Sequence, residues 1–258
     1  MAGEISATLG QLGRGALDFL LPPRCIACSG PVATNGGMCA GCWGRISFLA
    51  PPYCLCCGWP FESEMTADDD GSGLCAACLR QPPLYTRARA AMRYDDGCRD
   101  MLLSFKHRDR LQAAPVMAGW LAAAGRELFE DAGLIVPVPL HWTRLFERRF
   151  NQAAVLALAL ERRLRERVAV DVVPDLLVRR RRTASQGGLG RKGRERNVRA
   201  AFAVHPRRRA LVEDRAVVLI DDVFTTGATV GACTRTLLRA GAARVDVLTV
   251  ARVVQPQP

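Results

Sequence analysis

The chain has 258 residues, of which 49% are hydrophobic and 24% are charged, a composition typical of a folded globular protein. This length allows one full α/β core together with a small module, and the formal net charge is +11. No stretch of the sequence is long and apolar enough to span a bilayer, so we expect no membrane insertion and a cytoplasmic location.

The first 20 residues predict a short amphipathic helix. Ile5, Leu9 and Leu12 follow one another at helical spacing on a single face. A secretory signal peptide would need a longer apolar region, and Glu4 and several glycines interrupt it here. We therefore expect a helix over 1–20 that packs on its own protein.

Eight of the eleven cysteines form four C-x-x-C pairs in the first third of the chain. These pairs are Cys25/Cys28, Cys39/Cys42, Cys54/Cys57 and Cys75/Cys78. Each pair directs two thiolates at one ion, and two pairs complete a tetrahedral Cys₄ zinc site that is closed to catalysis. Without a secretion signal, disulfides are disfavoured, and four pairs in series favour metal over redox chemistry. Residues 21–85 therefore predict a double zinc ribbon with two structural Zn²⁺ ions.

The spacing of the pairs leaves their partnership open. Ten residues separate the first two pairs and seventeen separate the last two. We expect sequential pairing, and a cross-brace that joins the first pair to the third is the alternative. Of the remaining cysteines, Cys56 is a spare thiol, whereas Cys98 and Cys233 are expected to be small buried hydrophobes.

From about residue 86 the pattern changes to alternating helices and strands. Helices are expected over 97–106, 111–129, 151–168 and 231–241, and strands over 134–140, 170–173, 176–178, 217–220 and 244–251. Alternation of this kind predicts an α/β fold with a mostly parallel sheet flanked by helices.

The most informative segment is 216–230, where an apolar run ends in Asp221 and Asp222 and a short turn follows. The turn consists of Thr225, Thr226, Gly227, Ala228 and Thr229. Two adjacent carboxylates can accept hydrogen bonds from the hydroxyls of a ribose and help to hold Mg²⁺ near a polyphosphate. Backbone amides at the start of the next helix, together with hydroxyls, form an anion site. The alternative is a solvated turn whose threonines only cap the helix.

This segment resembles the 5-phosphoribosyl-1-pyrophosphate (PRPP) motif of type I phosphoribosyltransferases. The wider chain, from about residue 21 to 252, resembles the ComF/GntX family, and the further blocks that carry the likeness are 21–28, 104–107, 136–152 and 183–202. The resemblance implies a small Cys-rich zinc-ribbon module followed by a type I phosphoribosyltransferase-like domain over 86–258. It also implies a link to competence, the uptake of DNA for natural transformation.

Four positions depart from the family pattern. Arg149 stands where Gly is usual, Gly193 where an acidic residue is usual, and Arg108 and Asp109 where Gly is common. These departures leave the fine geometry of the loops open.

The resemblance also implies roles for individual residues. Asp221 and Asp222 are the expected catalytic pair that orients the ribose, and the turn over 225–229 is expected to anchor the 5′-phosphate with Mg²⁺ beside the pyrophosphate. The basic residues expected to bind substrate are Lys106, Arg148, Arg149, Arg191 and Arg194. For Lys106, a solvated position at a helix end is the alternative.

The positive charge is concentrated in one segment. Residues 179–209 contain twelve Arg or Lys and one Glu, which accounts for the whole excess. The resemblance places a mobile loop here, whose arginines would neutralise pyrophosphate. The same arginines would also suit a nucleic-acid backbone, and a solvated basic loop is the third interpretation.

Two functions follow from these observations. The first is a protein that binds PRPP or a nucleotide with Mg²⁺, with phosphoribosyl transfer left open. The second is a non-enzymatic accessory protein of natural transformation that binds single-stranded DNA. In the second, the zinc module docks a protein partner of the DNA-uptake machinery.

Overall fold

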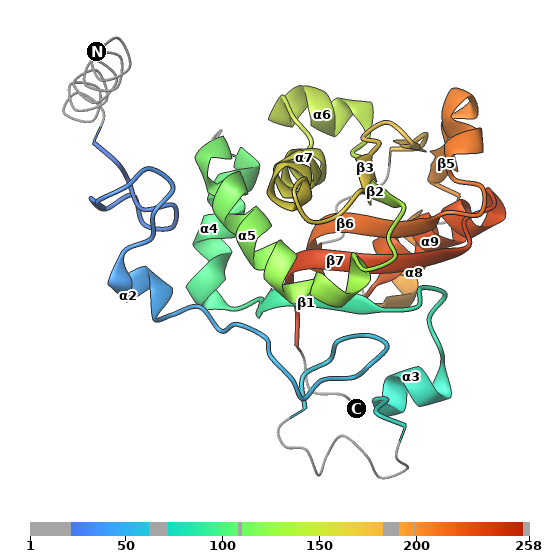
Figure 1. Cartoon of the computed structure of the whole chain (residues 1–258), viewed down its shortest axis with the longest axis horizontal. Coiled ribbons are helices and arrows are strands. Elements are labelled where there is room, and N and C mark those ends of the chain that lie inside the picture. Colours follow the sequence, from blue (N-terminus) through green and yellow to red (C-terminus); the bar gives the residue numbers. More distant parts are fainter. Residues whose placement is uncertain (1–21, 62–71, 108–109, 183–190, 199, 255–258) are drawn as a thin grey trace.

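The computed structural model describes residues 22–61, 72–107, 110–182, 191–198 and 200–254 (Figure 1). The helix expected over 1–20 lies outside these ranges, and the domain boundaries near residues 20 and 85 stay a prediction. Within the described ranges, no helix has both the length and the apolar character needed to cross a membrane.

A five-stranded parallel sheet forms the centre of the fold, with β6 in its middle. The strands lie side by side in the order β1 (Ala88–Arg93), β7 (Arg244–Arg252), β6 (Ala216–Phe224), β2 (Leu134–Pro137) and β3 (Asp171–Val172). Pro137 pairs with Ile220, and Asp221 pairs with Thr249. The carboxyl ends of β2 and β6 therefore meet at one edge of the sheet.

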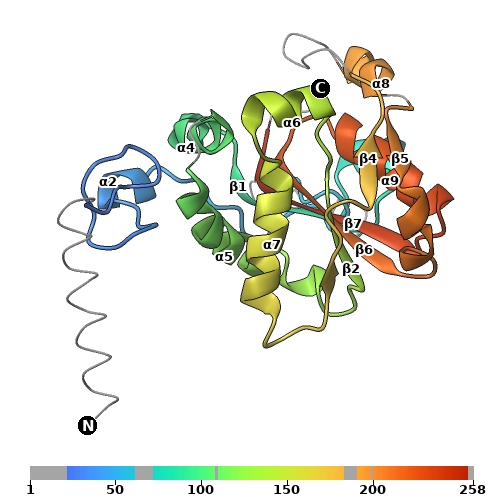
Figure 2. The same ribbon diagram turned by 90° about the horizontal axis from the view of Figure 1, so that it is seen from above.

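Helices cover both faces of this sheet (Figure 2). One face packs against α4 (Asp96–His107), α5 (Ala114–Ala124) and α7 (Gln152–Leu164), and the other against α9 (Ala228–Arg239) and the antiparallel hairpin of β4 (Leu177–Arg179) and β5 (Phe202–Val204). Val218 and Ile220 face the first layer, whereas Val217 and Leu219 face the second. Burial on both faces explains why β6 begins as a continuous apolar run.

Short elements complete the described part of the chain. They are α2 (Ala40–Trp43), α3 (Ala76–Arg80), α6 (Trp142–Arg148), α8 (Arg191–Val198) and the 3₁₀ turns η2 (Leu111–Ala113), η3 (Arg126–Leu128) and η4 (Pro206–Leu211). The predicted fold class, a parallel sheet flanked by helices and preceded by a Cys-rich module, is confirmed.

Several predicted boundaries need correction. The helix expected over 111–129 is divided into η2, α5 and η3, because Gly125 ends α5 at a close approach to Leu248. Strand β1 was not expected at all. Asp221 and Asp222 lie inside β6 rather than after it, since the strand continues to Phe224 through its pairing with Arg252.

The Cys-rich module runs along the outer edge of β1. Backbone amides join the two across this edge, from Leu49 to the Ala91 carbonyl at 3.0 Å and from Ala88 to the Cys56 carbonyl at 2.7 Å. At Gly58, with φ of 67°, an added Cβ would lie 2.4 Å from the Ala88 oxygen. Only glycine fits this contact, so the module lies in close backbone contact with the sheet.

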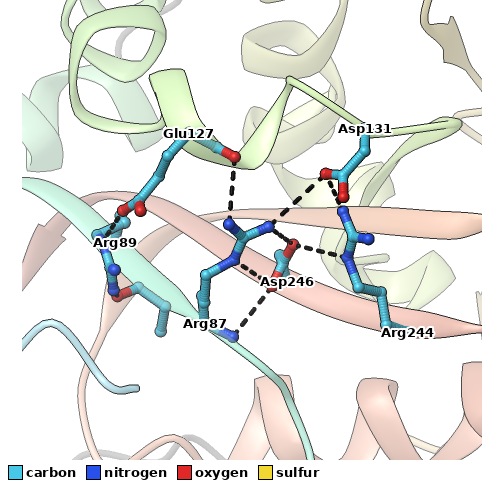
Figure 3. A network of polar contacts seen from close by, with 7 residues as sticks. Arg87, Arg89, Glu127, Asp131, Arg244 and Asp246 are labelled. Atoms are coloured by element: carbon cyan, nitrogen blue, oxygen red, sulfur yellow. Dashed lines mark hydrogen bonds and ion pairs between the residues drawn. The ribbon is translucent and has the colours of Figure 1, made fainter. Parts of the chain in front are cut away.

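An ionic network ties the amino ends of β1 and β7 to the segment after α5 (Figure 3). The carboxylate of Asp246 is 2% exposed and accepts hydrogen bonds from the Arg87 side chain and from Arg244. Arg244 also pairs with Asp131, and Glu127 pairs with Arg89. This network lies at the end of the sheet opposite the carboxyl ends of β2 and β6.

Candidate functional site

A cavity of about 210 Å³ opens at the carboxyl ends of β2 and β6. Open α/β sheets bind their ligands at this end of the strands. The charged and polar side chains that line the cavity come from Lys106, Arg144, Arg148, Asn151, Gln152, Arg179, Asp221, Asp222, Thr225 and Thr229. We call this cavity the ligand pocket.

The two adjacent carboxylates of the ligand pocket are held differently. Asp221 accepts a hydrogen bond from the amide of Asp222 at 2.9 Å, and Asp222 accepts one from the amide of Val223 at 2.7 Å. The second oxygen of Asp222 pairs with Lys106 at 2.7 Å. Burial, followed by the charge of Asp222, raises the pKa of Asp221 to about 8. Near neutral pH, Asp221 is therefore largely protonated and can donate as well as accept hydrogen bonds.

Lys106 reaches the pocket from the carboxyl end of α4, so it is not the solvated residue of the alternative interpretation. The buried side chain of Gln152 holds this region together, because it donates to the Lys106 carbonyl at 3.2 Å and accepts from Arg148 at 3.3 Å.

Burial lowers the pKa of Arg148, and burial followed by the charge of Arg144 lowers that of Arg179. A bound anion would offset this cost for both arginines.

The turn after β6 depends on Gly227. Its φ of 77° is in the left-handed region, and an added Cβ would lie 3.0 Å from the ring of Phe224. Helix α9 starts at the next residue, so its first amides face the same end of the sheet. Thr225, Gly227 and Thr229 line the pocket. Thr226 and Ala228 do not, and the buried Thr226 hydroxyl has no hydrogen-bond partner among the described residues.

Arg149 stands where the family pattern has Gly, and its backbone still adopts a conformation typical of glycine. Arg149 has φ of 66°, the left-handed conformation that glycine adopts most readily, and ends α6. Its exposed side chain does not line the pocket. Asn151 then caps α7 by accepting from the Ala153 amide and holds the end of β2 by donating to the Val138 carbonyl at 3.0 Å.

Basic residues of the segment over 179–209 lie on two separate elements, α8 and β4. Arg191 and Arg194 lie on α8, and their side chains fall outside what the structure describes. Arg179, which the sequence grouped with a solvated charge run, is partly buried, lies 5.2 Å from the centre of the Phe202 ring and lines the pocket.

Sequence reasoning named no role for Gln152 and did not place Arg179 in the pocket. The only sequence signal for Gln152 was its position directly after Asn151 in the third family block.

The eight predicted zinc ligands form two clusters. Cys25, Cys28, Cys39 and Cys42 make the first, and Cys54, Cys57, Cys75 and Cys78 make the second, with the sulfur atoms of each cluster within 4.8 Å of one another. This confirms the sequential pairing over the cross-brace.

The sulfur geometry fits zinc. The Cys28–Cys39 and Cys57–Cys75 distances are 3.8 and 3.7 Å, close to the roughly 3.8 Å edge of a tetrahedron with Zn–S bonds of about 2.3 Å. Amides of Cys57 and Cys75 donate to the Cys54 sulfur, which favours its thiolate. The spare Cys56 is in neither cluster, and Cys98 and Cys233 are fully buried as expected.

Comparisons with known proteins also identify the Cys-rich module. Residues 16–79 match the family model described as a double zinc ribbon domain. Competence protein F of Haemophilus influenzae is 29% identical over 89% of this chain and 96% of its own length. DNA utilization protein YhgH of Escherichia coli K12 is 32% identical, covering 70% of this chain and 78% of that protein. Competence protein ComFC of Bacillus subtilis is 27% identical over 67% of this chain and 68% of its own length.

Solved structures give more distant likenesses. A glutamine phosphoribosylpyrophosphate amidotransferase from B. subtilis is 19% identical with a TM-score of 0.37, over 57% of this chain and 30% of that one. A hypoxanthine phosphoribosyltransferase from Trypanosoma cruzi is 14% identical with a TM-score of 0.31, and the match covers 56% of this chain and 67% of that one. The sequence relatives are much closer: with YhgH 32% identical across 78% of its own length, the chain belongs to the ComF family.

Proposed function

We propose that the ligand pocket binds PRPP or a nucleotide together with Mg²⁺. The observation that carries this proposal is the meeting of Asp221 and Asp222 with four cationic side chains and the start of α9 in one cavity. A phosphorylated ribose offers hydroxyls and phosphates in the same small volume. Such a ligand would contact both the carboxylates and the cationic groups of the pocket.

Each part of this ligand has a group that suits it. The amides at the start of α9 and the hydroxyls of Thr225 and Thr229 suit the 5′-phosphate, and Asp221 and Asp222 suit the ribose hydroxyls. Arg148 and Arg179 suit the pyrophosphate. Carboxylates are ligands that Mg²⁺ accepts, and Mg²⁺ would supply further positive charge beside the pyrophosphate.

Phosphoribosyl transfer in this pocket would rest on positioning and charge. Among the described residues that line the pocket, there is no serine, cysteine or histidine to attack the sugar. The cations would stabilise departing pyrophosphate, while Asp221 and Asp222 orient the ribose for an acceptor.

Calorimetric titration with PRPP, with and without Mg²⁺, tests the binding proposal. We expect binding by the wild-type protein that strengthens with Mg²⁺, and its loss in Asp221→Asn/Asp222→Asn. Asp131→Asn is the matched control, since this exposed carboxylate lies in the network at the other end of the sheet. Absence of heat with PRPP and with nucleotides, in protein that retains its zinc, would overturn the proposal.

A second candidate function, binding of single-stranded DNA, is supported by a different surface. A groove of about 400 Å³ between the β4–β5 hairpin, η4 and α9 is lined by Arg180, Arg209 and Arg239. None of these three side chains pairs with a carboxylate in the described ranges, whereas Arg208 nearby pairs with Asp175. The names of the relatives, which refer to competence and DNA utilization, favour the same ligand.

Fluorescence anisotropy with a labelled oligothymidine at increasing salt tests this second function. Removing the three groove arginines together should weaken binding and flatten its salt dependence, because each phosphate contact adds to the slope. Arg208→Gln is the control, since its charge is already compensated. Equal loss in the control would assign the binding to net charge alone. The predicted protein partner of the zinc module stays a prediction.

A further inference from the structure

Arg252 lies between the second zinc cluster and the turn that begins the ligand pocket. It is the last residue of β7, it is 5% exposed, and it pairs in register with Phe224 at the end of β6. Its guanidinium donates a hydrogen bond to the carbonyl of Cys57, one of the four zinc ligands of the second cluster. The same guanidinium lies 5.3 Å from the centre of the Trp59 ring and 4.9 Å from that of Phe224.

The Phe224 end of this contact reaches the turn itself. Phe224 is 7% exposed and packs edge-on against Tyr85 at 6.1 Å. Its ring lies directly under Gly227, where even a methyl group would come within 3.0 Å. Phe224 therefore packs closely against the backbone of the turn that carries Thr225 and Gly227 into the pocket.

The charge of Arg252 has no carboxylate partner among the residues that the structure describes, and its Nε is buried without a hydrogen bond. A buried cation in this state is costly unless a negative charge lies nearby. Four thiolates around one Zn²⁺ carry an excess negative charge, and the second cluster contacts Arg252 through the Cys57 carbonyl. Zinc also fixes the backbone of the Cys54–Cys57 pair, so loss of the metal releases the Cys57 carbonyl that Arg252 binds.

We propose that Arg252 is a positioning residue that couples zinc in the second cluster to the conformation of the phosphate-binding turn over 224–230. With zinc bound, the charged cluster keeps the guanidinium between Trp59 and Phe224, and Phe224 supports Gly227. Without it, Arg252 withdraws toward water and the turn loses its support. The biological role of the turn as a phosphate site rests on the proposed function, but the coupling itself does not.

The molecule contains a natural control. The first zinc cluster also has an arginine beside it, because Arg45 donates to the Cys42 sulfur at 3.5 Å. Arg45 is exposed, and within the described part of the chain no hydrogen bond or ion pair joins its side chain to the turn over 224–230. Removing either this arginine or the first zinc ion should leave the turn unchanged.

Hydrogen–deuterium exchange of the full-length, zinc-loaded protein, read by mass spectrometry over 224–230, tests the proposal without any ligand. We expect Arg252→Met to retain its zinc and to exchange roughly tenfold faster in this turn, which is the scale of one desolvated cation–π contact. Arg252→Lys should recover part of the protection, because it keeps the charge but loses the planar stacking. Arg45→Met should match the wild type.

A second measurement covers the case in which Arg252→Met does not fold. Zinc is withdrawn stepwise from the wild-type protein and from Cys28→Ser/Cys39→Ser, which lacks the first cluster. Exchange in the turn should rise only with the zinc of the second cluster and should be normal in the loaded double variant. Unchanged exchange on loss of that zinc, or an equal rise with loss of the first, overturns the coupling. Absence of PRPP binding by the wild type would overturn only the proposed function.

Discussion

Lys106 and Asp222 form an ion pair of 2.7 Å across the ligand pocket, although one lies in the last turn of α4 and the other near the end of β6. Both side chains are largely buried, with 21% and 16% of their surface exposed. The pair keeps the charge of Asp222 compensated while no ligand is present. A metal ion that uses this carboxylate must first displace the lysine.

Lys106→Met should therefore strengthen the binding of free Mn²⁺, a spectroscopic substitute for Mg²⁺, by roughly threefold to tenfold. The same variant should weaken the binding of PRPP, because a cation is lost from the pocket. Electron paramagnetic resonance of Mn²⁺ and calorimetry with PRPP measure the two effects separately. If both affinities fall together, Lys106 is not competing with the metal.

Gly227→Ala should destabilise the protein by about 1–2 kcal/mol, because its φ of 77° strains any residue with a Cβ and the added methyl would contact Phe224. Gly231→Ala is the matched control within α9, where an added Cβ meets nothing within 4 Å. There the change should stabilise by about 0.5–1 kcal/mol. Urea unfolding of the two variants measures both signs, and a loss at both positions would contradict this reading of the turn.

The raised pKa of Asp221 makes stability depend on pH. Between its ordinary pKa of about 4 in the unfolded chain and about 8 in the folded protein, the folded state holds a proton that the unfolded state has released. The stabilisation of the folded state by this proton is fully present below pH 4 and is lost as the pH rises through 8. Asp221→Asn removes this dependence, so its melting temperature should exceed that of the wild type by more at pH 8 than at pH 5. Parallel profiles in Mg²⁺-free buffer would show that Asp221 titrates normally.

The two zinc clusters should release their metal at different rates. All four ligands of the second cluster are buried, whereas Cys28 is exposed and Cys39 is partly exposed in the first. Zinc release to a chromogenic chelator should show two phases of equal amplitude, with rates that differ by on the order of tenfold. The slow phase should remain in Cys28→Ser/Cys39→Ser, and disappearance of the slow phase instead would reverse the assignment.

Asp246→Asn should cost about 2–4 kcal/mol of stability, because it leaves Arg87 and Arg244 without their shared buried carboxylate. Asp131→Asn in the same network should cost less than about 1 kcal/mol, since 59% of that side chain is exposed. PRPP binding at the other end of the sheet should be the same in both variants. Chemical denaturation and calorimetry test the two statements.

The central strand β6 could be predicted from the sequence because burial on both faces demands an unbroken apolar run, as in 217–220, and β7 because apolar residues predominate over 244–251. Strand β1 offered no such signal. Its sequence, Ala-Arg-Ala-Ala-Met-Arg, is poor in residues that favour strands, and its position depends on pairing with β7 and on the cover of the Cys-rich module.

The residues of the candidate site also differ in how well the sequence alone predicted them. Asp221, Asp222 and the following turn are neighbours in the chain, so their order alone indicated a sugar-phosphate site. Lys106 and Arg179 come from elements far away in the sequence. Lys106 was expected at the site only through the family resemblance, and only packing separates Arg179 from the many other basic residues of this chain. The two cysteines of each C-x-x-C pair were predictable as ligands of one ion because this spacing is a local geometric constraint, whereas the sequential partnership of the pairs came from the structure.

The cover of β1 by the Cys-rich module has a consequence for the behaviour of metal-depleted protein. β1 is the outermost strand of the sheet, and the module satisfies hydrogen-bonding groups on the side that faces away from β7. An open strand edge invites a second molecule to add its own strand, and such additions lead to aggregates. Loss of zinc would therefore uncover this strand edge and promote aggregation, so the metal sites also help to keep the protein in solution.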